Sequence, residues 1–121
     1  MNKSFHYLVP SVAPLNLTAI PGPYPGSMAN LTWNAIPAIY QNGIVTGYRI
    51  RYAIYSYKDQ TEEGVTYEYA DNKTEHALIY LLPARNYSIR VAAVNLVGTG
   101  NYSNMILHHT SDGGKVRSLH R

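Results

Sequence analysis

The sequence contains no cysteine among its 121 residues. Disulfide bonds, thiolate metal sites and thiol-based catalysis are therefore excluded. The compartment is not decided by this absence, because a chain of this length can fold without covalent cross-links wherever it is located. Charged residues are also scarce, at 14% against an average of ~25%. Hydrophobic residues nevertheless make up 45%, so the composition is that of a folded domain and not of a disordered chain.

Long apolar segments are missing as well. No run approaches the ~20 apolar residues that cross a bilayer, so we expect no membrane segment within this chain. Residues 1–10 carry one lysine, no long apolar stretch and no small-residue cleavage site, which is not the pattern of a signal peptide. A secreted origin would therefore require that the chain is a piece of a longer precursor.

The charge balance is weak and concentrated at one end. Ten Lys and Arg against seven Asp and Glu give a net charge of +3. Three of the basic residues, Lys115, Arg117 and Arg121, lie in the last few residues, and without them the balance is neutral. A nucleic-acid-binding domain needs a clustered basic face, so we expect no nucleic-acid partner.

Asn-x-Ser/Thr triplets, the acceptor motif for N-linked glycans, are over-represented. Ten Asn and sixteen Ser or Thr in this length predict roughly one such triplet by chance. The sequence has six. Since a glycan is tolerated only where the side chain meets solvent, and is added on the secretory route, this excess favours an extracellular origin. The candidate glycosylation sites are Asn2, Asn16, Asn30, Asn72, Asn86 and Asn101.

The distribution of Pro and Gly is typical of an all-β protein. Between these breaks lie short segments of alternating polarity, rich in Tyr, Val, Ile and Thr, and no segment keeps helical spacing over three turns. The segments predict strands at 15–20, 27–34, 45–57, 65–70, 75–80, 86–95 and 105–110. Seven short strands in about 100 residues predict a seven-stranded antiparallel β-sandwich. We expect one domain at 13–110, with a flank or linker at 1–12 and a flexible tail or linker at 111–121.

Alternation also predicts which side chains face the core. The sets expected to share one face are Leu15, Leu17 and Ala19, and Ala29, Leu31 and Trp33. The sets expected to point inward are Tyr48, Ile50, Tyr52 and Ile54, and Tyr87, Ile89, Val91 and Ala93. Between strands, we expect a solvated acidic loop at 58–64 and a β-turn at Gly98–Gly100 joining the last two strands.

Two stretches of the chain resemble a fibronectin type III domain. The first carries Leu31-x-Trp33, Pro37 and Asn42-Gly43-x-x-x-Gly47-Tyr48-x-Ile50-x-Tyr52. The second carries Leu81-Leu82-Pro83-Ala84-Arg85-Asn86-Tyr87, similar to the family's Leu-x-Pro-x-Thr-x-Tyr corner with Arg85 in place of Thr, then Ile89-Arg90-Val91-x-Ala93-x-Asn95-x-x-Gly98-x-Gly100-x-x-Ser103. The resemblance implies an immunoglobulin-like sandwich of fibronectin type III topology. Its expected signature residues are Trp33, Tyr48, Leu81, Pro83 and Tyr87.

A physical argument accompanies this resemblance. A Tyr at the start of an inner strand can place its ring in the core and direct its hydroxyl to upstream backbone, which is the tyrosine corner expected at Tyr87. Trp33 would be the large central filler. An immunoglobulin domain would need paired Cys and a Trp on the third strand, whereas this chain has no Cys and its Trp on the second predicted strand.

No set of residues predicts catalysis, and we expect neither an enzyme nor a cofactor or metal. The histidines lie mainly at strand ends or termini, and the adjacent His108 and His109 must point to opposite faces of a strand. The acidic group Asp59, Glu62 and Glu63 lacks the ~6–8 oxygen ligands on a defined spacing that calcium requires.

A protein-binding face is the remaining candidate site. If the third and sixth strands pair as in the family, Arg49, Arg51 and Arg90 share the outward face of one sheet, with Tyr55 and Tyr57 beside them. Arg and Tyr are enriched in interface hot spots. The alternative is a ladder of cross-strand Tyr–Arg pairs that only stabilises the sheet. Asn16 and Asn30 fall on the opposite sheet, so glycans there would leave the Arg face open.

The resemblance implies a non-catalytic extracellular module that binds proteins or spaces its neighbours within a larger receptor or adhesion protein. Its partners would be an extracellular ligand or co-receptor and the adjacent domains of the parent chain. Two alternatives stay open: a module of an intracellular muscle-type scaffold, and an accessory module of an enzyme such as a receptor phosphatase, a receptor kinase or a glycoside hydrolase. Fold alone does not choose among them.

Overall fold

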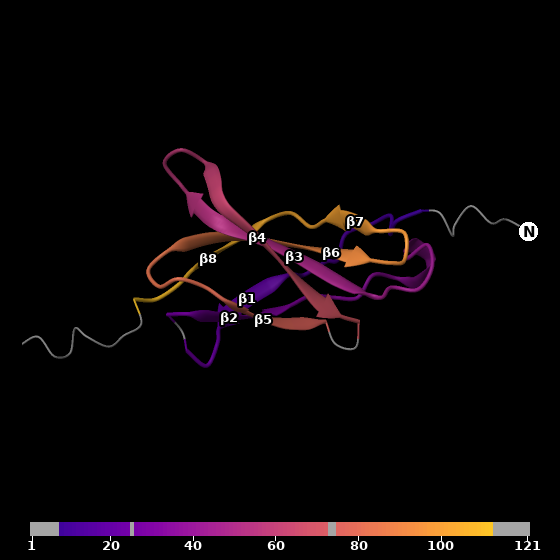
Figure 1. The fold of residues 1–121 in the computed structure, drawn as a ribbon, viewed down its shortest axis with the longest axis horizontal. Helices are drawn as coiled ribbons and strands as arrows, with labels where there is room; N and C mark the ends of the chain where they lie inside the picture. The colour runs from indigo at the N-terminus through magenta and orange to yellow at the C-terminus, as the bar shows by residue number, and fades with distance from the viewer. Residues whose placement is uncertain (1–7, 25, 73–74, 113–121) are drawn as a thin grey trace, which may run out of the picture.

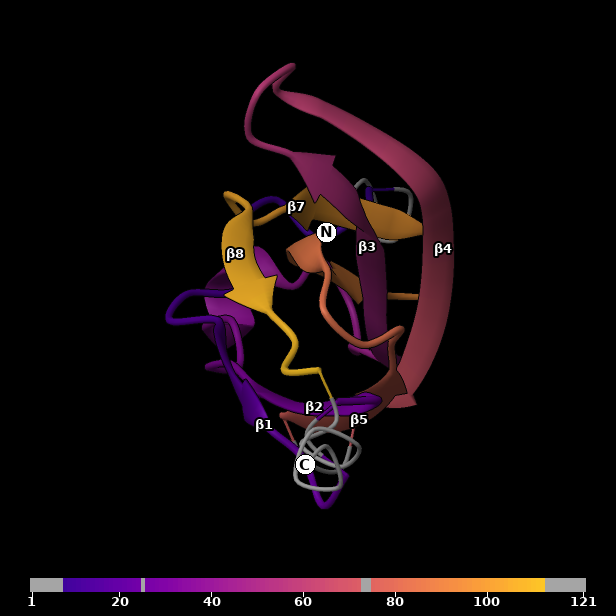
Figure 2. The same ribbon diagram turned by 90° about the vertical axis from the view of Figure 1, so that its left-hand side faces the viewer.

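The alternating segments form two facing antiparallel sheets (Figures 1 and 2). The computed structural model describes residues 8–24, 26–72 and 75–112. The smaller sheet has the order β1-β2-β5, formed by Thr18–Pro21, Met28–Thr32 and His76–Tyr80. The larger has the order β4-β3-β6-β7, and β8 also pairs with β6; its strands are β3 Gly47–Ser56, β4 Thr61–Asp71, β6 Asn86–Val94, β7 Thr99–Tyr102 and β8 Ile106–His109. A 3-10 turn, η2, covers Ala38–Tyr40.

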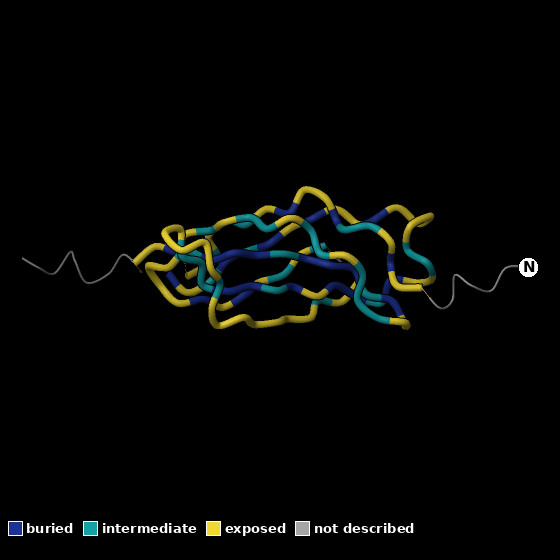
Figure 3. Tube along the Cα trace, turned by 90° about the horizontal axis from the view of Figure 1, so that it is seen from above, coloured by how far each residue is buried: buried dark blue, intermediate teal, exposed yellow. Residues whose placement is uncertain are grey.

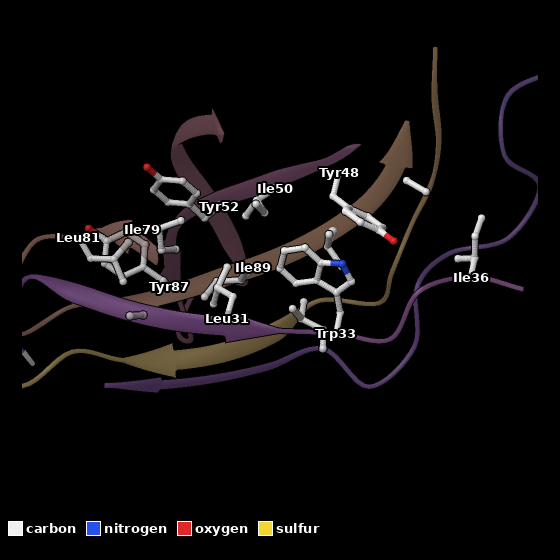
Figure 4. Close-up of a cluster of buried hydrophobic side chains, with 14 of the residues drawn as sticks. Leu31, Trp33, Ile36, Tyr48, Ile50, Tyr52, Ile79, Leu81, Tyr87 and Ile89 are labelled. Carbon is white, nitrogen blue, oxygen red and sulfur yellow. The ribbon is translucent and has the colours of Figure 1, made fainter. Parts of the chain in front are cut away.

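The predicted antiparallel sandwich is confirmed, with eight strands among the described residues where seven were expected. Its core lies between the sheets (Figure 4). β2 and β5 contribute Leu31 and Ile79, and β3 and β6 contribute Ile50, Ile89 and Val91; each is almost completely shielded from water. Burying a Leu or Ile side chain is worth ~1.5–3 kcal/mol, so this alternation drives the two sheets together.

Aromatic rings fill both ends of the core. Trp33 packs edge to face against Tyr48, with ring centroids 5.2 Å apart. Burial, followed by the neighbouring carboxylates Glu75 and Glu68 that accept their hydrogen bonds, raises the pKa of Tyr48 and Tyr52 to about 12.

Tyr87 closes the opposite end of the core from Trp33. Its ring is buried beside that of Tyr52, with centroids 6.3 Å apart. Its hydroxyl accepts a hydrogen bond of 2.8 Å from the backbone N–H of Leu82, which is the geometry of a tyrosine corner. The ring thus packs in the core while the hydroxyl fixes the turn that leads into β6.

The first predicted strand begins later than expected. Leu15 was expected to begin this strand on the same face as Leu17 and Ala19, but it is 70% exposed, and β1 starts only at Thr18. The cause is Asn16, whose φ of 61° places it in the left-handed region and interrupts the extended chain. Leu17 and Ala19, beyond this break, do pack inward.

The predicted turn at Gly98–Gly100 is wrong, because Thr99 begins the unpredicted strand β7. The turn lies one step earlier, where the Asn95 backbone N–H donates to the Gly98 carbonyl at 3.1 Å. Gly100 packs directly against Pro10: a Cβ at this glycine would lie 2.5 Å from the Pro10 carbonyl oxygen. A glycine is therefore needed at position 100 because β7 packs closely against the backbone at Pro10, and not because the chain turns there.

The acidic loop predicted at 58–64 is also wrong in extent. Only residues 57–60 form the turn, and β4 begins at Thr61. A bulge then lets β4 continue: the register passes from Ile54–Glu63 to Tyr52–Thr66, so Gly64 and Val65 on β4 lie opposite one residue of β3. Gly64 has a φ of 67°, the left-handed conformation that glycine adopts at least cost.

Candidate protein-binding face

The outward face of the larger sheet brings the predicted arginines together. Arg51 on β3 lies directly opposite Arg90 on β6 and, on its other side, opposite Tyr67 on β4. Arg49, two residues earlier on the same face, lies opposite Tyr69. Adjacent strand positions on one face are close enough for side chains to interact, so the three arginines form one basic row.

Glu62 neutralises most of this row. Its carboxylate forms ion pairs with Arg51 at 2.9 Å and with Arg90 at 2.7 Å, and the Ser88 hydroxyl donates to it at 2.8 Å. Glu62 comes from β4 and Arg90 from β6, so the carboxylate reaches across the intervening strand β3. It can do so because the β3 residue opposite Ser88 is Ala53, whose methyl group leaves room above the sheet.

Hydrogen bonds within the sheet keep the Glu62 carboxylate ionised. Burial acts to raise the pKa of Glu62, but hydrogen bonds from Arg90, Ser88 and Arg51 outweigh it and lower this pKa to about 2. Both arginine side chains are largely shielded from solvent, with exposed fractions of 23% for Arg51 and 26% for Arg90. Arg51 and Arg90 therefore pair with a carboxylate of the same sheet, a partner that the expected Tyr–Arg ladder did not include.

Arg49 and the tyrosines of β4 remain accessible. The Arg49 guanidinium lies 4.2 Å from the centroid of the Tyr67 ring, a cation–π contact. The Tyr69 ring lies against Gly47, where no Cβ would fit, and its hydroxyl donates to the Thr46 carbonyl at 2.9 Å. These residues line a shallow depression closed by Val94 and Thr99. Glu68 also lines it, so the depression combines aromatic rings with one arginine and one carboxylate.

Tyr55 and Tyr57 lie away from this depression. Their rings pack edge to face with centroids 5.6 Å apart, at the end of β3 that leads into the hairpin. The structure therefore divides the five predicted binding residues into an accessible Arg49, an ion-paired Arg51 and Arg90, and a separate tyrosine pair. Glu62 was missed as their partner because it was assigned to a solvated loop.

The sequons occupy different environments. Asn16, Asn72 and Asn101 are exposed, and Asn30 and Asn86 are half-buried; Asn2 lies outside the described residues. Asn72 and Asn101 donate through Nδ2 to the backbone carbonyls of Val45 and Ser11. Asn30 and Asn86 instead engage a histidine ring through Oδ1, at 3.2 Å to His76 and 2.8 Å to His109.

A second surface lies at the end of the sandwich where the described chain begins. Asn95 is buried there, and its Nδ2 lies 2.9–3.1 Å from the carbonyl oxygens of Leu8, Gln41 and Asn42. Its Oδ1 accepts from the backbone N–H groups of Val97 and Gly98. One side chain thus joins three separate segments. Around it lie apolar residues open to solvent, including Ile44 at 78% and Leu96 at 92% exposure.

The described residues contain no cluster of three His, Asp or Glu side chains able to hold a metal ion. In the same part of the chain, no helix has the length and hydropathy of a membrane span.

The fold agrees with the comparisons to known proteins. The fibronectin type III domain model matches residues 12–108, and the chain belongs to this family. Among curated proteins it is 34% identical to Protein sidekick-1 of Gallus gallus over 104 residues, covering 82% of this chain and 4% of that protein. It is 34% identical to Protein sidekick-2 of Mus musculus over 89 residues, covering 69% of this chain and again 4% of that protein.

Solved structures show the same fold. The third fibronectin III domain of human KIAA0343 protein aligns with a TM-score of 0.74 at 23% identity, over 88% of this chain and 86% of that one. An fn3 domain of human contactin 1 aligns with a TM-score of 0.67 at 28% identity, over 84% and 79%. The chain therefore spans most of each of these solved domains but only a small part of the length of its curated relatives.

Proposed function

We propose that the chain is a non-catalytic extracellular module of a long cell-surface adhesion protein, in which it spaces neighbouring domains and presents a protein-binding face. The observation that carries this proposal is the size relation to the sidekick proteins: most of this chain matches, yet it covers only 4% of each relative. The six sequons support the extracellular location independently of the comparisons.

The spacer role is supported by the direction of the chain. The described residues enter the sandwich at one end and leave it at the other (Figure 3). Domains linked in this way extend along a line. The apolar residues around Asn95, at the entry end, would pack against a preceding domain, and the five hydrogen bonds of Asn95 would keep that surface rigid.

The binding role is assigned to the part of the predicted face that the fold leaves free. Arg49, Tyr67 and Tyr69 combine a cation with two rings. The Tyr67 ring is held by the Arg49 guanidinium and the Tyr69 hydroxyl by the Thr46 carbonyl, which lowers the entropy lost on binding. Arg51 and Arg90 contribute less to this surface, because removing either would disturb the charge of Glu62. We therefore centre the face on Arg49.

The location is tested by secreting the chain from mammalian cells behind an added signal peptide and measuring its intact mass before and after enzymatic removal of N-glycans. A mass decrease, with several Asn converted to Asp, is the expected result. Efficient secretion without any decrease would remove the sequon argument and favour the intracellular scaffold.

The binding role is tested separately, with fluorescent tetramers of the secreted chain titrated onto cultured cells. The double variant Arg49→Ala, Tyr67→Ala should reduce saturable binding at least tenfold. Arg85→Ala is the matched control, because it removes an exposed arginine from the corner before β6. Absence of binding by the unmodified chain would leave the spacer role alone.

A further inference from the structure

The outer face of the smaller sheet places one sequon among apolar side chains. On this face Asn30 of β2 lies opposite Ile20 of β1 on one side and opposite Leu78 of β5 on the other. Tyr80 lies one row away, opposite Met28. Ile20 is 59% exposed, Leu78 39% and Tyr80 67%.

The core does not account for these apolar residues. The inward positions of the same strands are Ala29, Leu31 and Ile79, which are fully buried against the larger sheet. An antiparallel sheet with one face on the core normally turns polar side chains outward. Here Ile20, Leu78 and Tyr80 lie beside and to one side of Asn30, while the next row on its other side, Thr18, Thr32 and His76, is polar. Asn30 begins the triplet Asn30-Leu31-Thr32.

The Asn30 side chain is held in a way that leaves its glycan-accepting atom available. Oδ1 lies 3.2 Å from Nε2 of His76, which is register-paired with Thr32 on the same face. Among the described residues, Nδ2 of Asn30 has no hydrogen-bond partner. Asn72 and Asn101 differ, since their Nδ2 atoms donate to backbone carbonyls.

We propose that Asn30 carries an N-glycan whose first sugars lie over Ile20, Leu78 and Tyr80, so that the glycan stabilises the domain and keeps this sheet from contacting other chains. This rests on the extracellular location proposed above. In the transfer, a bond forms between Nδ2 and C1 of the first N-acetylglucosamine while C1 separates from a lipid diphosphate carrier. The amide loses one proton, the diphosphate leaves, and no oxidation or reduction is involved.

The apolar face suits this occupant for two reasons. The C–H faces of a pyranose ring pack on aliphatic and aromatic side chains, as other amphipathic groups do. The glycan is also attached between Ile20 and Leu78, so covering them costs no translational entropy, unlike the binding of a separate molecule.

The test is a double comparison on the 121-residue chain. Wild type and Asn30→Gln are each made in mammalian cells, with glycans, and in bacteria, without them, and Tm is measured for all four. The bacterial pair records the effect of losing the contact with His76. We expect the mammalian pair to show an additional loss of about 3–5 °C, the scale of one methylene group removed from water in a domain of this size.

Two controls locate the effect. Asn101→Gln removes a sequon on β7, and the additional loss of Tm in its mammalian pair should be near zero. Tyr80→Ser removes part of the apolar surface, and the Tm gained on glycosylation should then shrink. Peptide mapping of the mammalian protein reports which Asn residues carry glycans.

The outcomes separate this inference from the proposed function. Glycans at other sites with Asn30 unoccupied would overturn the inference and leave the extracellular module standing. Asn30 occupied without an additional loss of Tm would overturn the covering role alone. A secreted chain with no glycans at any site would remove the basis of both.

Discussion

The carboxylate of Glu62 lies 2.7 Å from the guanidinium of Arg90 although a whole strand separates their backbones. Glu62 belongs to β4 and Arg90 to β6, with β3 between them. The contact, together with that to Arg51, ties three strands of the larger sheet through one side chain. It turns what the alternation pattern presents as a free basic row into an internal network.

Replacing Glu62 with Gln should therefore destabilise the fold. Arg51 and Arg90 face each other in register, and without the Glu62 carboxylate their two positive charges would repel each other. We expect a loss of about 1–2 kcal/mol in the free energy of unfolding, above the range of exposed pairs because the carboxylate also receives Ser88. Urea unfolding followed by the fluorescence of Trp33, the sole tryptophan, measures it. Glu63→Gln is the control, as this exposed neighbour makes neither ion pair; equal losses in both variants would contradict the network.

The same network predicts a dependence on acid. The pKa of Glu62 falls from an ordinary 4.5 to about 2 on folding. A carboxylate whose pKa folding lowers contributes stability that is complete above pH 4.5 and is lost as the pH falls through about 2. The urea midpoints of wild type and Glu62→Gln should therefore converge between these pH values. His108, whose pKa is lowered by burial, changes charge in both proteins, so the difference between them isolates Glu62. A constant difference down to pH 2 would argue against it.

Gly64→Ala tests the bulge that positions Glu62. A Cβ at Gly64 meets nothing within 4 Å, so its cost comes from the left-handed backbone alone. We expect a loss of about 1–2 kcal/mol, from strain of an L-residue in this conformation. Gly64→Asn should lose less, because Asn tolerates the left-handed region. The two variants compared by urea unfolding give the answer, and the reverse order would show that conformation is not the determinant.

Tyr87→Phe tests the tyrosine corner. The ring stays in the core, and only the hydrogen bond from the Leu82 N–H is lost, so we expect a decrease of about 1 kcal/mol in unfolding free energy. Tyr57→Phe removes a hydroxyl from an exposed ring and should change the free energy of unfolding by less than about 0.5 kcal/mol. A corner variant as stable as this control would show that the hydroxyl contributes nothing.

Asn95→Ala tests the hydrogen bonds by which the Asn95 side chain connects three segments at the end of the sandwich where the described chain begins. It removes five hydrogen bonds from a buried position and should cost about 2–3 kcal/mol. Hydrogen exchange gives a local readout, because the amides of Val97 and Gly98 lose their acceptor and should exchange faster than those of β2. Unchanged exchange at these two amides would mean that the loop holds its conformation without Asn95.

Much of the core followed from local pattern. Strict alternation placed Ala29, Leu31 and Trp33, and likewise the inward residues of β6, because each strand has one face on the core and a period of two. It also placed Arg49, Arg51 and Arg90 on one outward face. Leu15 failed because a single residue, Asn16, leaves the extended region, and an Asn-specific backbone state has no periodic signal.

The class of fold, most of the core residues, the family and the excess of glycan-acceptor triplets follow from the order of residues along the chain, because these depend on composition, spacing and a period of two. Which arginines are free depends instead on contacts within the folded sheet. By strict alternation from Tyr67, Glu62 would face the core; the extra residue of the bulge at Gly64 reverses this and turns the carboxylate outward over Ala53. Likewise, register alone set Ile20 and Leu78 on either side of Asn30. Both outcomes depend on which residues pair between strands distant in sequence, and strand pairing is a property of the folded sheet.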